Sequence, residues 1–425
     1  MGSDLEKTVR ELDIPNSLDL LRGRWEESGA QGPPPGWPTA SEVRDAARLA
    51  RLPPEIEAAC LACRDWVAAS DLRLRLLWHC YHALFRAPWA SASLARELPT
   101  LVHLPEPAPL FGALLCLCAA LRLRAMHAAR GIPEEVTSTT LRDLHLWIVE
   151  HRRRTGTWGF SEMVWLWRHL SGTVVQLGRL QFELSTYHED FHVFRSRRAG
   201  EITILAGDGM KLRADGQFAD ADGAAVQQGV RAARFVASPE GWEGERVDPG
   251  GFVTGSRARL SREEWEPALE RGDPVLGVHI PAGGDAPGSG PMTPEACEQS
   301  FAAARDYVSR HFPEHGARAF TCSSWLLDPQ LCRYLPESTN IVRFQRRFHL
   351  LPVRGAGPGQ HFERVVGFGA KAPANAAELD ELAGRLEQGG RSPSAVERAL
   401  VEHMRLGKVW REGAGVIPLA NVGRR

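Results

Sequence analysis

The sequence predicts an α+β protein, with an all-helical N-terminal half followed by a mixed α/β sheet in the C-terminal half. Three observations lead to this. The length of 425 residues favours two or three domains over one enlarged core. Apolar residues recur at helical spacing as far as about residue 170. Beyond that point, short alternating segments are separated by turn dipeptides such as Asp208-Gly209 and Asp215-Gly216.

Composition and charge exclude several classes of protein. The chain is 43% hydrophobic and 24% charged, which is typical of a globular protein and excludes wholesale disorder. The net charge of -1 provides no overall basic field, so we expect no nucleic-acid partner. The cations are nearly all Arg, which indicates GC-rich codon usage and a bacterial origin.

The N-terminus shows no pattern of a secretory signal, so we expect a cytoplasmic protein. The longest apolar run, Leu110 to Leu121, is shorter than the roughly 20 residues of a membrane span; we expect a buried core helix and no membrane partner. The eight cysteines are expected to be reduced thiols. Cys60 and Cys63 form a C-x2-C pair, but no second pair follows at zinc spacing, so we expect no metal.

The first half divides into an arm and a helical domain. Residues 1–40 are polar and end in the Pro- and Gly-rich stretch 32–38, so we expect a flexible arm. Residues 41–170 are expected to form the helical domain, with long apolar runs near 108–129, 133–151 and 160–170. Four prolines between residues 98 and 109 predict a connection there.

The second half is expected to hold a sheet domain over residues 171–370 and a helical tail over residues 371–425. The predicted strands are 173–184, 201–205, 275–281, 319–325 and 364–369. One helix is predicted from Pro294 to Phe312, with Thr293 as its N-cap and Pro294 at the first helical position. A strand, a loop, a capped helix and a strand make a βαβ unit.

The loop of this unit is rich in glycine. It follows the strand that ends at Pro281 and precedes Thr293, and four of its residues are Gly283, Gly284, Gly288 and Gly290. Free backbone N–H groups and the positive end of the helix face such a loop, and this geometry suits a pyrophosphate. The alternative is a surface loop whose glycines serve only its turns.

Four segments carry a resemblance to a known family. Residues 177–183, 279–281, 322–329 and 337–348 resemble a bacterial two-domain acyltransferase family, which has a helical N-acyltransferase N-terminal domain and a GNAT-like C-terminal domain. The resemblance covers roughly residues 40 to 370. It implies an enzyme, an acyl-CoA-dependent N-acyltransferase that moves an acyl group from coenzyme A to the amine of a small molecule by direct attack. The oligomeric state is left open.

The resemblance also implies where acyl-CoA binds. The residues expected to hold it lie at the end of the 275–281 strand, in the glycine-rich loop and at the starts of two helices: Ile280, Ala282, Gly283, Gly284, Gly288, Ser289, Gly290, Thr293 and Asn340. The family's usual pyrophosphate signature, Gln or Arg followed by x-x-Gly-x-Gly or Ala, is missing from this loop.

His279 is the candidate general base. Strand alternation places His279 on the face opposite Val278 and Ile280, and imidazole takes up and releases protons near neutral pH. Alternatively, the ring only donates to a neighbouring backbone carbonyl. Glu183 shares a strand face with Arg179, where it would pair with the acceptor amine or orient His279; the plainer alternative is charge balance with Arg179 on an exposed face.

The proton donor for the departing thiolate departs from the family's pattern. In the family, a tyrosine often serves this purpose. It would fall near Gln345 if Phe344 and Phe348 are aligned with the apolar positions of that helix, and an amide cannot act as an acid. Either the thiolate leaves unaided, or Tyr334 or Ser324 supplies the proton. This departure supports a rival reading, in which the protein is a non-catalytic acyl-CoA-binding or regulatory module. A third reading, a thiol hydrolase that uses Cys322, competes with the view that Cys322 is a buried core residue.

Overall fold

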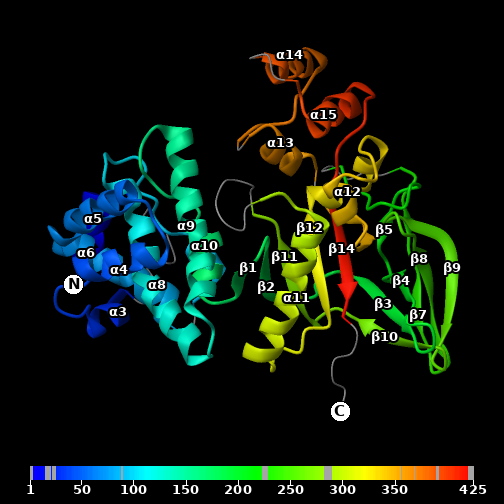
Figure 1. Cartoon of the computed structure of the whole chain (residues 1–425), viewed down its shortest axis with the longest axis horizontal. Coiled ribbons are helices and arrows are strands. Elements are labelled where there is room, and N and C mark those ends of the chain that lie inside the picture. Colours follow the sequence, from blue (N-terminus) through cyan, green and yellow to red (C-terminus); the bar gives the residue numbers. More distant parts are fainter. Residues whose placement is uncertain are drawn as a thin grey trace. The chain divides into compact units, whose positions relative to one another are not determined.

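The computed structural model describes residues 3–14, 21, 25–87, 90–222, 228–281, 290–355, 357–367, 369–388 and 392–419 (Figure 1). The chain divides into two compact units, the N-terminal unit Met1–Leu177 and the C-terminal unit Gly178–Arg425. Each unit is described by itself.

The N-terminal unit is helical, as the sequence predicts. Its α-helices are α1 (Ser3–Glu11), α3 (Trp25–Gln31), α4 (Ala40–Leu49), α5 (Pro54–Ala68), α6 (Asp71–Tyr81), α7 (Ala92–Arg96), α8 (Phe111–Ala129), α9 (Glu134–Thr155) and α10 (Met163–Leu170). A π-helical turn, η1 (His82–Arg86), follows α6, and a 3-10 turn, η2 (Ala108–Leu110), precedes α8. Strand β1 (Val174–Leu177) ends the unit.

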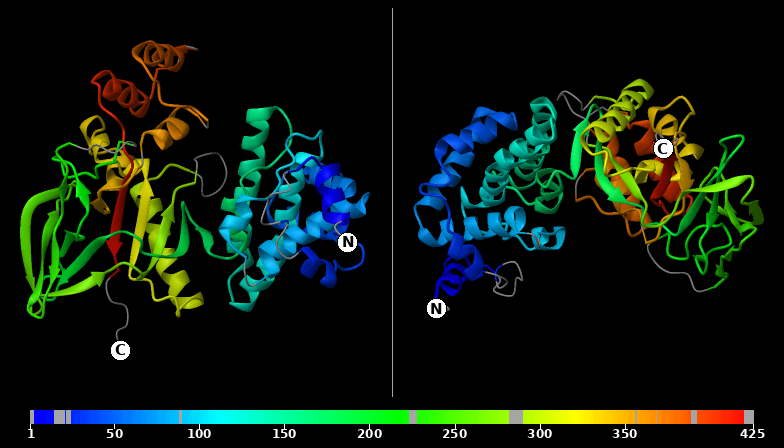
Figure 2. Two further views of the ribbon diagram at one scale, coloured as in Figure 1. Left: turned by 180° about the vertical axis from the view of Figure 1, so that it is seen from behind. Right: turned by 90° about the horizontal axis from the view of Figure 1, so that it is seen from below.

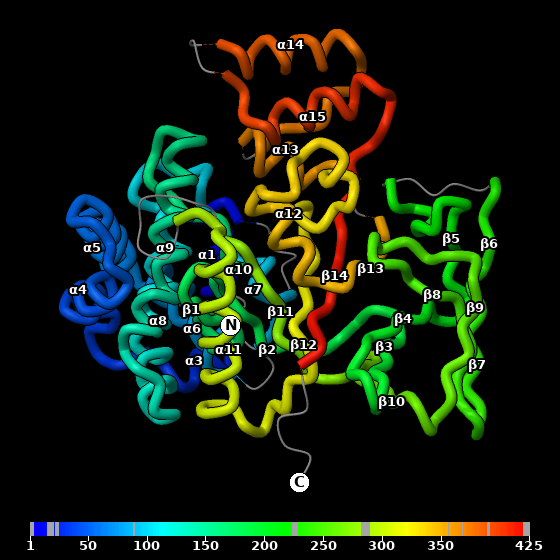
Figure 3. The backbone as a smooth tube through the Cα atoms, turned by 45° about the vertical axis from the view of Figure 1, so that its right-hand side comes forward, coloured from blue at the N-terminus to red at the C-terminus, as the bar shows by residue number. Residues whose placement is uncertain are grey.

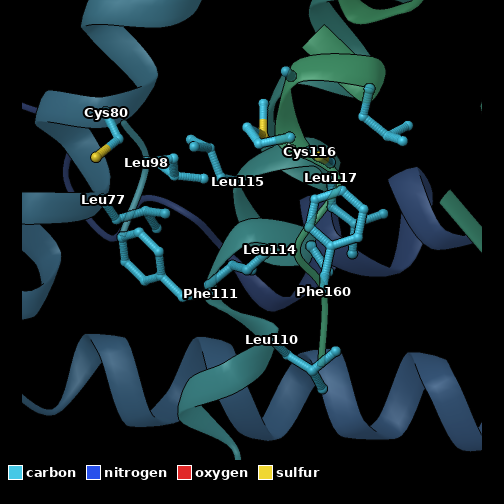
Figure 4. Close-up of a cluster of buried hydrophobic side chains, with 14 of the residues drawn as sticks. Leu77, Cys80, Leu98, Leu110, Phe111, Leu114, Leu115, Cys116, Leu117 and Phe160 are labelled. Atoms are coloured by element: carbon cyan, nitrogen blue, oxygen red, sulfur yellow. Dashed lines mark hydrogen bonds between the residues drawn. The ribbon is translucent and has the colours of Figure 1, made fainter. Parts of the chain in front are cut away.

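Helix α8 forms the centre of this unit. Its side chains Phe111, Leu114 and Leu115 lie in one apolar cluster with Leu77 and Phe160 (Figure 4). The segment Ala108–Ala129 is long and apolar enough to cross a membrane by length and composition, with a mean hydropathy of 1.6, but 67% of its most apolar stretch is buried in the protein. The apolar segment is therefore longer than the run Leu110 to Leu121 that is apparent in the sequence. Its burial agrees with the predicted core helix.

The first 40 residues differ from the predicted flexible arm. Helices α1 and α3 form there, and Leu12 and Trp25 are buried in the core of the unit. Ser28 Oγ lies 2.7 Å from His79 Nδ1, and Trp78 Nε1 donates to the Ser28 carbonyl at 2.8 Å, which ties α3 to α6. The polar composition concealed these few buried side chains, which are enough to dock short helices.

The C-terminal unit contains a mixed sheet of the predicted kind. Its strands are β2 (Leu180–Thr186), β11 (Pro274–His279), β12 (Ala319–Ser324), β13 (His349–Leu351) and β14 (Gly413–Pro418), in the order β2-β11-β12-β14-β13. Only β11 and β12 run parallel; the other neighbours are antiparallel. Helix α11 (Pro294–His311) connects β11 to β12 and completes the predicted βαβ unit (Figure 1).

Helix α11 is held to the sheet by aromatic packing. The Phe301 ring centroid lies 5.9 Å from that of Phe182 on β2 and 4.9 Å from that of Phe320 on β12. All three side chains are buried. This contact fixes the N-terminal end of α11 relative to the strands that lead into it.

A second sheet is inserted between β2 and β11, where the sequence predicted one strand at 201–205. Its strands are β3 (Phe191–Ser196), β4 (Ile202–Ala206), β7 (Phe235–Ala237), β8 (Gly241–Val247), β9 (Val253–Ser261) and β10 (Trp265–Leu269). Their order is β10-β3-β4-β8-β7, and β9 pairs with β8. A small ribbon joins β5 (Lys211–Leu212) to β6 (Arg231–Ala232). Figure 3 shows these strands as a separate layer of the unit.

Short helices cover one end of the first sheet. The 3-10 turns η3 (Trp325–Leu327) and η4 (Pro329–Arg333) and helix α12 (Asn340–Gln345) follow β12, and α13 (Gly359–Val365), α14 (Ala376–Glu387) and α15 (Ala395–Arg405) follow β13 (Figure 2). The strand predicted at 364–369 is wrong, because α13 occupies its first two residues. Phe362 on this helix is completely buried, so tertiary packing overrides the local alternation.

The predicted helical tail also needs correction. Helices α14 and α15 are present, but β14 follows them and lies between β12 and β13 within the sheet. The glycines of this segment resemble a loop in sequence. In the structure, a Cβ added at Gly413 would lie 2.0 Å from the Leu327 carbonyl oxygen, and one at Gly415 would lie 2.7 Å from Phe348 Cβ. Close backbone approach, rather than turn formation, explains these glycines.

Candidate active site

His279 and Glu183 are brought together on adjacent strands. His279 is the last residue of β11, and Glu183 lies in the middle of β2. In the antiparallel register, His279 stands opposite Gln181, and Glu183 stands opposite Gly277. His279 Nε2 lies 2.9 Å from Glu183 Oε2, and the two side chains are 31% and 18% exposed. The pair is therefore held by the sheet and is accessible from outside.

This contact determines how the imidazole is used. A carboxylate only accepts, so the ring donates its Nε2 proton to Glu183. Nδ1 is then the nitrogen with the basic lone pair. A ring fixed in one tautomer by a carboxylate is the usual form of a general base in proteins. The charge-balance alternative for Glu183 is not what the structure shows, since the guanidinium of Arg179 donates to a backbone carbonyl instead.

Gly277 leaves room for this pair. A Cβ added there would lie 3.4 Å from Glu183 Cβ and 3.7 Å from His279 Nε2. The carboxylate crosses the face of the sheet above Gly277 to reach the ring two residues further along β11. A larger side chain at this position would compete for the same space.

The N-terminal end of α11 is the expected phosphate site. Thr293 is the N-cap, as predicted, and its side chain accepts a hydrogen bond from the Ala296 N–H at 3.2 Å. Ile280 is half-buried just beyond β11. Gly290 is exposed, and its carbonyl accepts from Arg179 Nε at 2.5 Å. The predicted contacts Ala282, Gly283, Gly284, Gly288 and Ser289 lie outside the described residues.

Asn340 is the first residue of α12, but it does not cap that helix. Thr339 is the N-cap, and its side chain accepts from the Val342 N–H. The expectation that Asn340 starts a helix is confirmed, although the preceding residue provides the cap. Nothing in the contacts of Asn340 assigns it to coenzyme A.

The two candidate proton donors have other partners. Ser324 is buried at the end of β12, and its Oγ accepts from the Leu326 N–H at 3.2 Å, which caps η3. Tyr334 Oη lies 2.9 Å from His403 Nδ1, inside an apolar cluster with Trp410. Burial raises the pKa of the Tyr334 hydroxyl, which weakens it further as an acid. The structure thus gives both residues structural contacts.

Gln345 is likewise structural. Its amide Nε2 donates to the carbonyls of Leu326 and Asp328 at 3.3 and 2.8 Å, and its Oε1 accepts from the Cys332 thiol. The side chain is buried. The amide therefore joins α12 to the turns that follow β12, a task that a tyrosine could not perform in the same way.

The cysteines are placed as core residues. Cys322 is 4% exposed, and burial raises its pKa to about 12. Cys60 and Cys63 are completely buried, and burial raises the pKa of Cys60 to about 12 as well. Thiols with such values are protonated and unreactive at neutral pH, which argues against the thiol hydrolase. Among the described residues, no group of three or more His, Cys, Asp and Glu side chains is arranged to hold a metal ion.

Arg179 is a residue whose importance the sequence did not reveal. The sequence suggested only a charge partner for Glu183, whereas the structure places the guanidinium at the N-terminal end of α11. A signal was present in the sequence, since Arg179 follows the turn residue Gly178 and directly precedes the strand that carries Gln181 and Glu183.

Comparison with known proteins agrees with this geometry. The model of the N-acyltransferase N-terminal domain matches residues 41–172, and that of the GNAT-like C-terminal domain matches residues 174–417. Similar solved structures include a mutant acyltransferase in complex with octanoyl-CoA (25% identity, TM-score 0.63) and an acyltransferase in complex with decanoyl-CoA (26% identity, TM-score 0.62). A third is an acyltransferase in complex with CoA and 10C-teicoplanin (26% identity, TM-score 0.61).

In each case the alignment covers 98% of this chain and 100% of the other. Among curated protein sequences, none matches the chain significantly. The predicted two-part architecture, the enzyme class and the use of acyl-CoA are confirmed. The chain belongs to the acyltransferase family whose members join an N-acyltransferase N-terminal domain to a GNAT-like C-terminal domain.

Proposed function

We propose that the protein transfers the acyl group of a medium-chain acyl-CoA to the amine of a small molecule by direct attack, with His279 as general base and Glu183 as its positioning residue. The observation that carries this proposal is the 2.9 Å contact between His279 Nε2 and Glu183 Oε2, at the end of the strand that leads into α11.

The chemistry needs one protein base. The acceptor arrives as an ammonium, and His279 Nδ1 takes one of its protons, so that the nitrogen gains a lone pair. This nitrogen forms the C–N bond to the thioester carbonyl carbon, the C–S bond breaks, and coenzyme A leaves as a thiolate. The amide nitrogen releases its second proton to water, and the thiolate takes up the proton that the imidazolium holds, so His279 returns to the neutral form and one proton per turnover enters the solvent. No acyl-enzyme forms.

Glu183 supports the base in two ways. Its carboxylate accepts from Nε2, which orients the ring, and its negative charge lies beside the imidazolium that forms when Nδ1 is protonated. The side chain is only 18% exposed, so this interaction is screened less than one on the open surface.

The departing thiolate needs no dedicated acid in this proposal. A thiol is far more acidic than an alcohol, with a pKa near 8.5, so the thiolate is a good leaving group at neutral pH. This agrees with the structural contacts of Tyr334 and Ser324, and with the buried amide of Gln345.

The similar structures suggest what to test as substrates. They hold octanoyl-CoA and decanoyl-CoA, and two of them hold teicoplanin or 10C-teicoplanin. A medium acyl chain and a small-molecule acceptor of the teicoplanin class are therefore the first choices for this chain.

The test combines binding and turnover. The wild-type protein is incubated with decanoyl-CoA and a panel of amine-bearing glycopeptides, thiol release is followed, and the acylated product is identified by mass spectrometry. We expect one thiol per amide formed. Binding of decanoyl-CoA without turnover of any acceptor would favour the regulatory module, and thiol release without an amide would indicate hydrolysis. Either result would contradict the proposal.

A further inference from the structure

Arg179 is a buried cation that pairs with no carboxylate among the described residues. The residue is only 7% exposed. Its Nε donates to the Gly290 carbonyl at 2.5 Å, but its Nη1 is buried without a hydrogen-bond partner. Among the ion pairs that join described residues, none includes Arg179.

Such an arrangement is costly in the ligand-free protein. Burial lowers the pKa of Arg179 from its ordinary value, which shows that the surroundings disfavour the charged form. Other arginines of the C-terminal unit are arranged differently. Arg347 pairs with Glu298 at 2.5 Å, and Arg318 pairs with Asp273 at 2.5 Å. A buried guanidinium that keeps donors unused is typical of a site that receives an anion.

The position of Arg179 is fixed by α11. Its backbone N–H donates to Ser300 Oγ at 2.9 Å. The preceding Gly178 has a φ of +65°, and a Cβ there would lie 2.8 Å from Ser300 Oγ, so only glycine allows the turn to approach the helix this closely. The guanidinium is thus held beside Gly290, a few residues before the N-cap Thr293.

The helix end adds to the attraction for an anion. Helix α11 has 18 residues, and its positive end lies on the side of Gly290. Thr293 Oγ1 and Thr293 O accept from Ala296 and Cys297, and Pro294 has no N–H, so the first turn offers the Glu295 N–H. One backbone donor alone would be a poor anion site, and a buried guanidinium supplies the missing charge and donors.

We propose that Arg179 binds the diphosphate of coenzyme A and is the main protein cation for that group. This inference rests on the proposed function, because it takes acyl-CoA to be the donor substrate. The strand register supports the diphosphate over the ribose phosphate. His279 stands opposite Gln181, so Arg179 lies two residues from the level of the base, about 7 Å along β2. Of the phosphates of coenzyme A, the diphosphate is the group nearer to the thioester.

The test measures binding to the intact protein by calorimetry. Arg179→Gln removes the positive charge. Arg179→Lys keeps the charge but lacks the planar guanidinium group with its paired N–H donors. We expect Arg179→Gln to weaken the binding of both CoA and dephospho-CoA by about tenfold to a hundredfold, as for loss of a charge-assisted hydrogen bond, with a smaller loss for Arg179→Lys. Turnover of acyl-pantetheine, which lacks phosphates, should be unchanged relative to the wild type.

A matched control is available on α11. Arg305 is partly exposed and lies 3.5 Å from Glu298. Arg305→Gln removes one positive charge near α11, and we expect it to leave the affinity for CoA unchanged. If Arg305→Gln and Arg179→Gln weaken CoA binding equally, the effect comes from the loss of positive charge in general and not from a contact of Arg179. This result would overturn the proposal.

A second readout separates binding from folding. If Arg179 only holds the loop through Gly290, its replacement should lower the melting temperature of the ligand-free protein. We expect Arg179→Gln to melt at or above the wild-type temperature without ligand, because an uncompensated charge is removed, and to show a smaller stabilisation by CoA. A clear fall in ligand-free stability would indicate a structural role and contradict the proposal.

The remaining outcomes are also decisive. If the wild type binds CoA and Arg179→Gln binds it equally well, the role of Arg179 is wrong and the proposed function stands. If Arg179→Gln weakens CoA but not dephospho-CoA, the diphosphate assignment is wrong. If the wild type binds no CoA at all, the proposed function fails first.

Discussion

Glu183 reaches His279 diagonally across the sheet: the carboxylate lies opposite Gly277, and its Oε2 is 2.9 Å from the ring nitrogen of His279 two residues further along β11. The contact depends on the antiparallel register of β2 and β11, because a shift of one residue would turn one of the two side chains to the other face. The candidate base and its orienting group are thus set by strand pairing.

Gly277 should be sensitive to side-chain size. The methyl group of Gly277→Ala would lie 3.4 Å from Glu183 Cβ, which is an ordinary van der Waals distance. The two further methyl groups of Gly277→Val would compete for the space that the side chains of Glu183 and His279 occupy. We expect Gly277→Ala to be active and Gly277→Val to lose up to about 100-fold in kcat, as for a misplaced catalytic group. Thermal melting serves as the control, and full activity of a folded Gly277→Val would contradict this view of the site.

Glu183 should affect kcat more than KM. Glu183→Gln keeps an acceptor for Nε2 but removes the charge beside the imidazolium, and Glu183→Ala removes both. We expect kcat to fall about tenfold for Glu183→Gln and further for Glu183→Ala, with the KM for acyl-CoA unchanged. Steady-state kinetics at saturating acyl-CoA measure this. An effect confined to the KM of the acceptor would show that Glu183 binds the amine instead.

Cys322 should be inert toward electrophiles. Burial raises its pKa to about 12, so the thiolate is almost absent at neutral pH, whereas Cys332 is exposed. We expect iodoacetamide to label Cys332 and to leave Cys322 unmodified in the folded protein, as read by peptide mass spectrometry. Cys322→Ala should retain acyl transfer. Rapid labelling of Cys322 with loss of activity would restore the thiol mechanism.

His361 should make the protein sensitive to acid. It is 1% exposed, stacks on Trp410, and burial lowers its pKa from 6.5 to about 3. Between these two values the unfolded chain binds a proton that the folded chain does not, so the free energy of unfolding decreases as the pH falls. We expect His361→Phe to remove this loss.

Urea unfolding at about pH 7.5 and about pH 5 would measure the effect. The gain of His361→Phe over the wild type should be larger at the lower pH, by up to about 2 kcal/mol. Asp328, whose pKa is raised to about 6 by burial, has the opposite pH dependence, and its carboxylate lies 3.5 Å from His361 Nε2. The comparison is therefore repeated in an Asp328→Asn background, which separates the contribution of His361 from that of Asp328. A difference that does not depend on pH would show that His361 titrates normally.

The sequence predicted the parts of the site that local pattern determines. Alternation placed His279 and Glu183 on polar strand faces, and the Thr293-Pro294 pair marked the start of α11. It offered the orientation of His279 as one alternative for Glu183 but could not decide for it, because the two residues are 96 positions apart and a whole sheet is inserted between their strands. Register between distant strands is a tertiary property.

The errors have the same origin. Tyr334 and Ser324 were plausible acids in sequence, but Tyr334 contacts His403, 69 residues later, and no local pattern shows this. The strand at Gly413–Pro418 was missed because its glycines suggest a loop, although they are required by close contacts with Leu327 and Phe348. Contacts with backbone that is distant in the sequence leave no local pattern, so the structure of residues that make such contacts is the hardest to predict.

The most direct test of the central claim is a comparison of the wild type with His279→Gln at saturating decanoyl-CoA and acceptor. The account predicts that amide formation falls by about 100-fold or more, the contribution expected of a general base, while the affinity for CoA is unchanged. If His279→Gln forms the amide as fast as the wild type, the imidazole beside Glu183 is not the base, and the proposed mechanism is wrong.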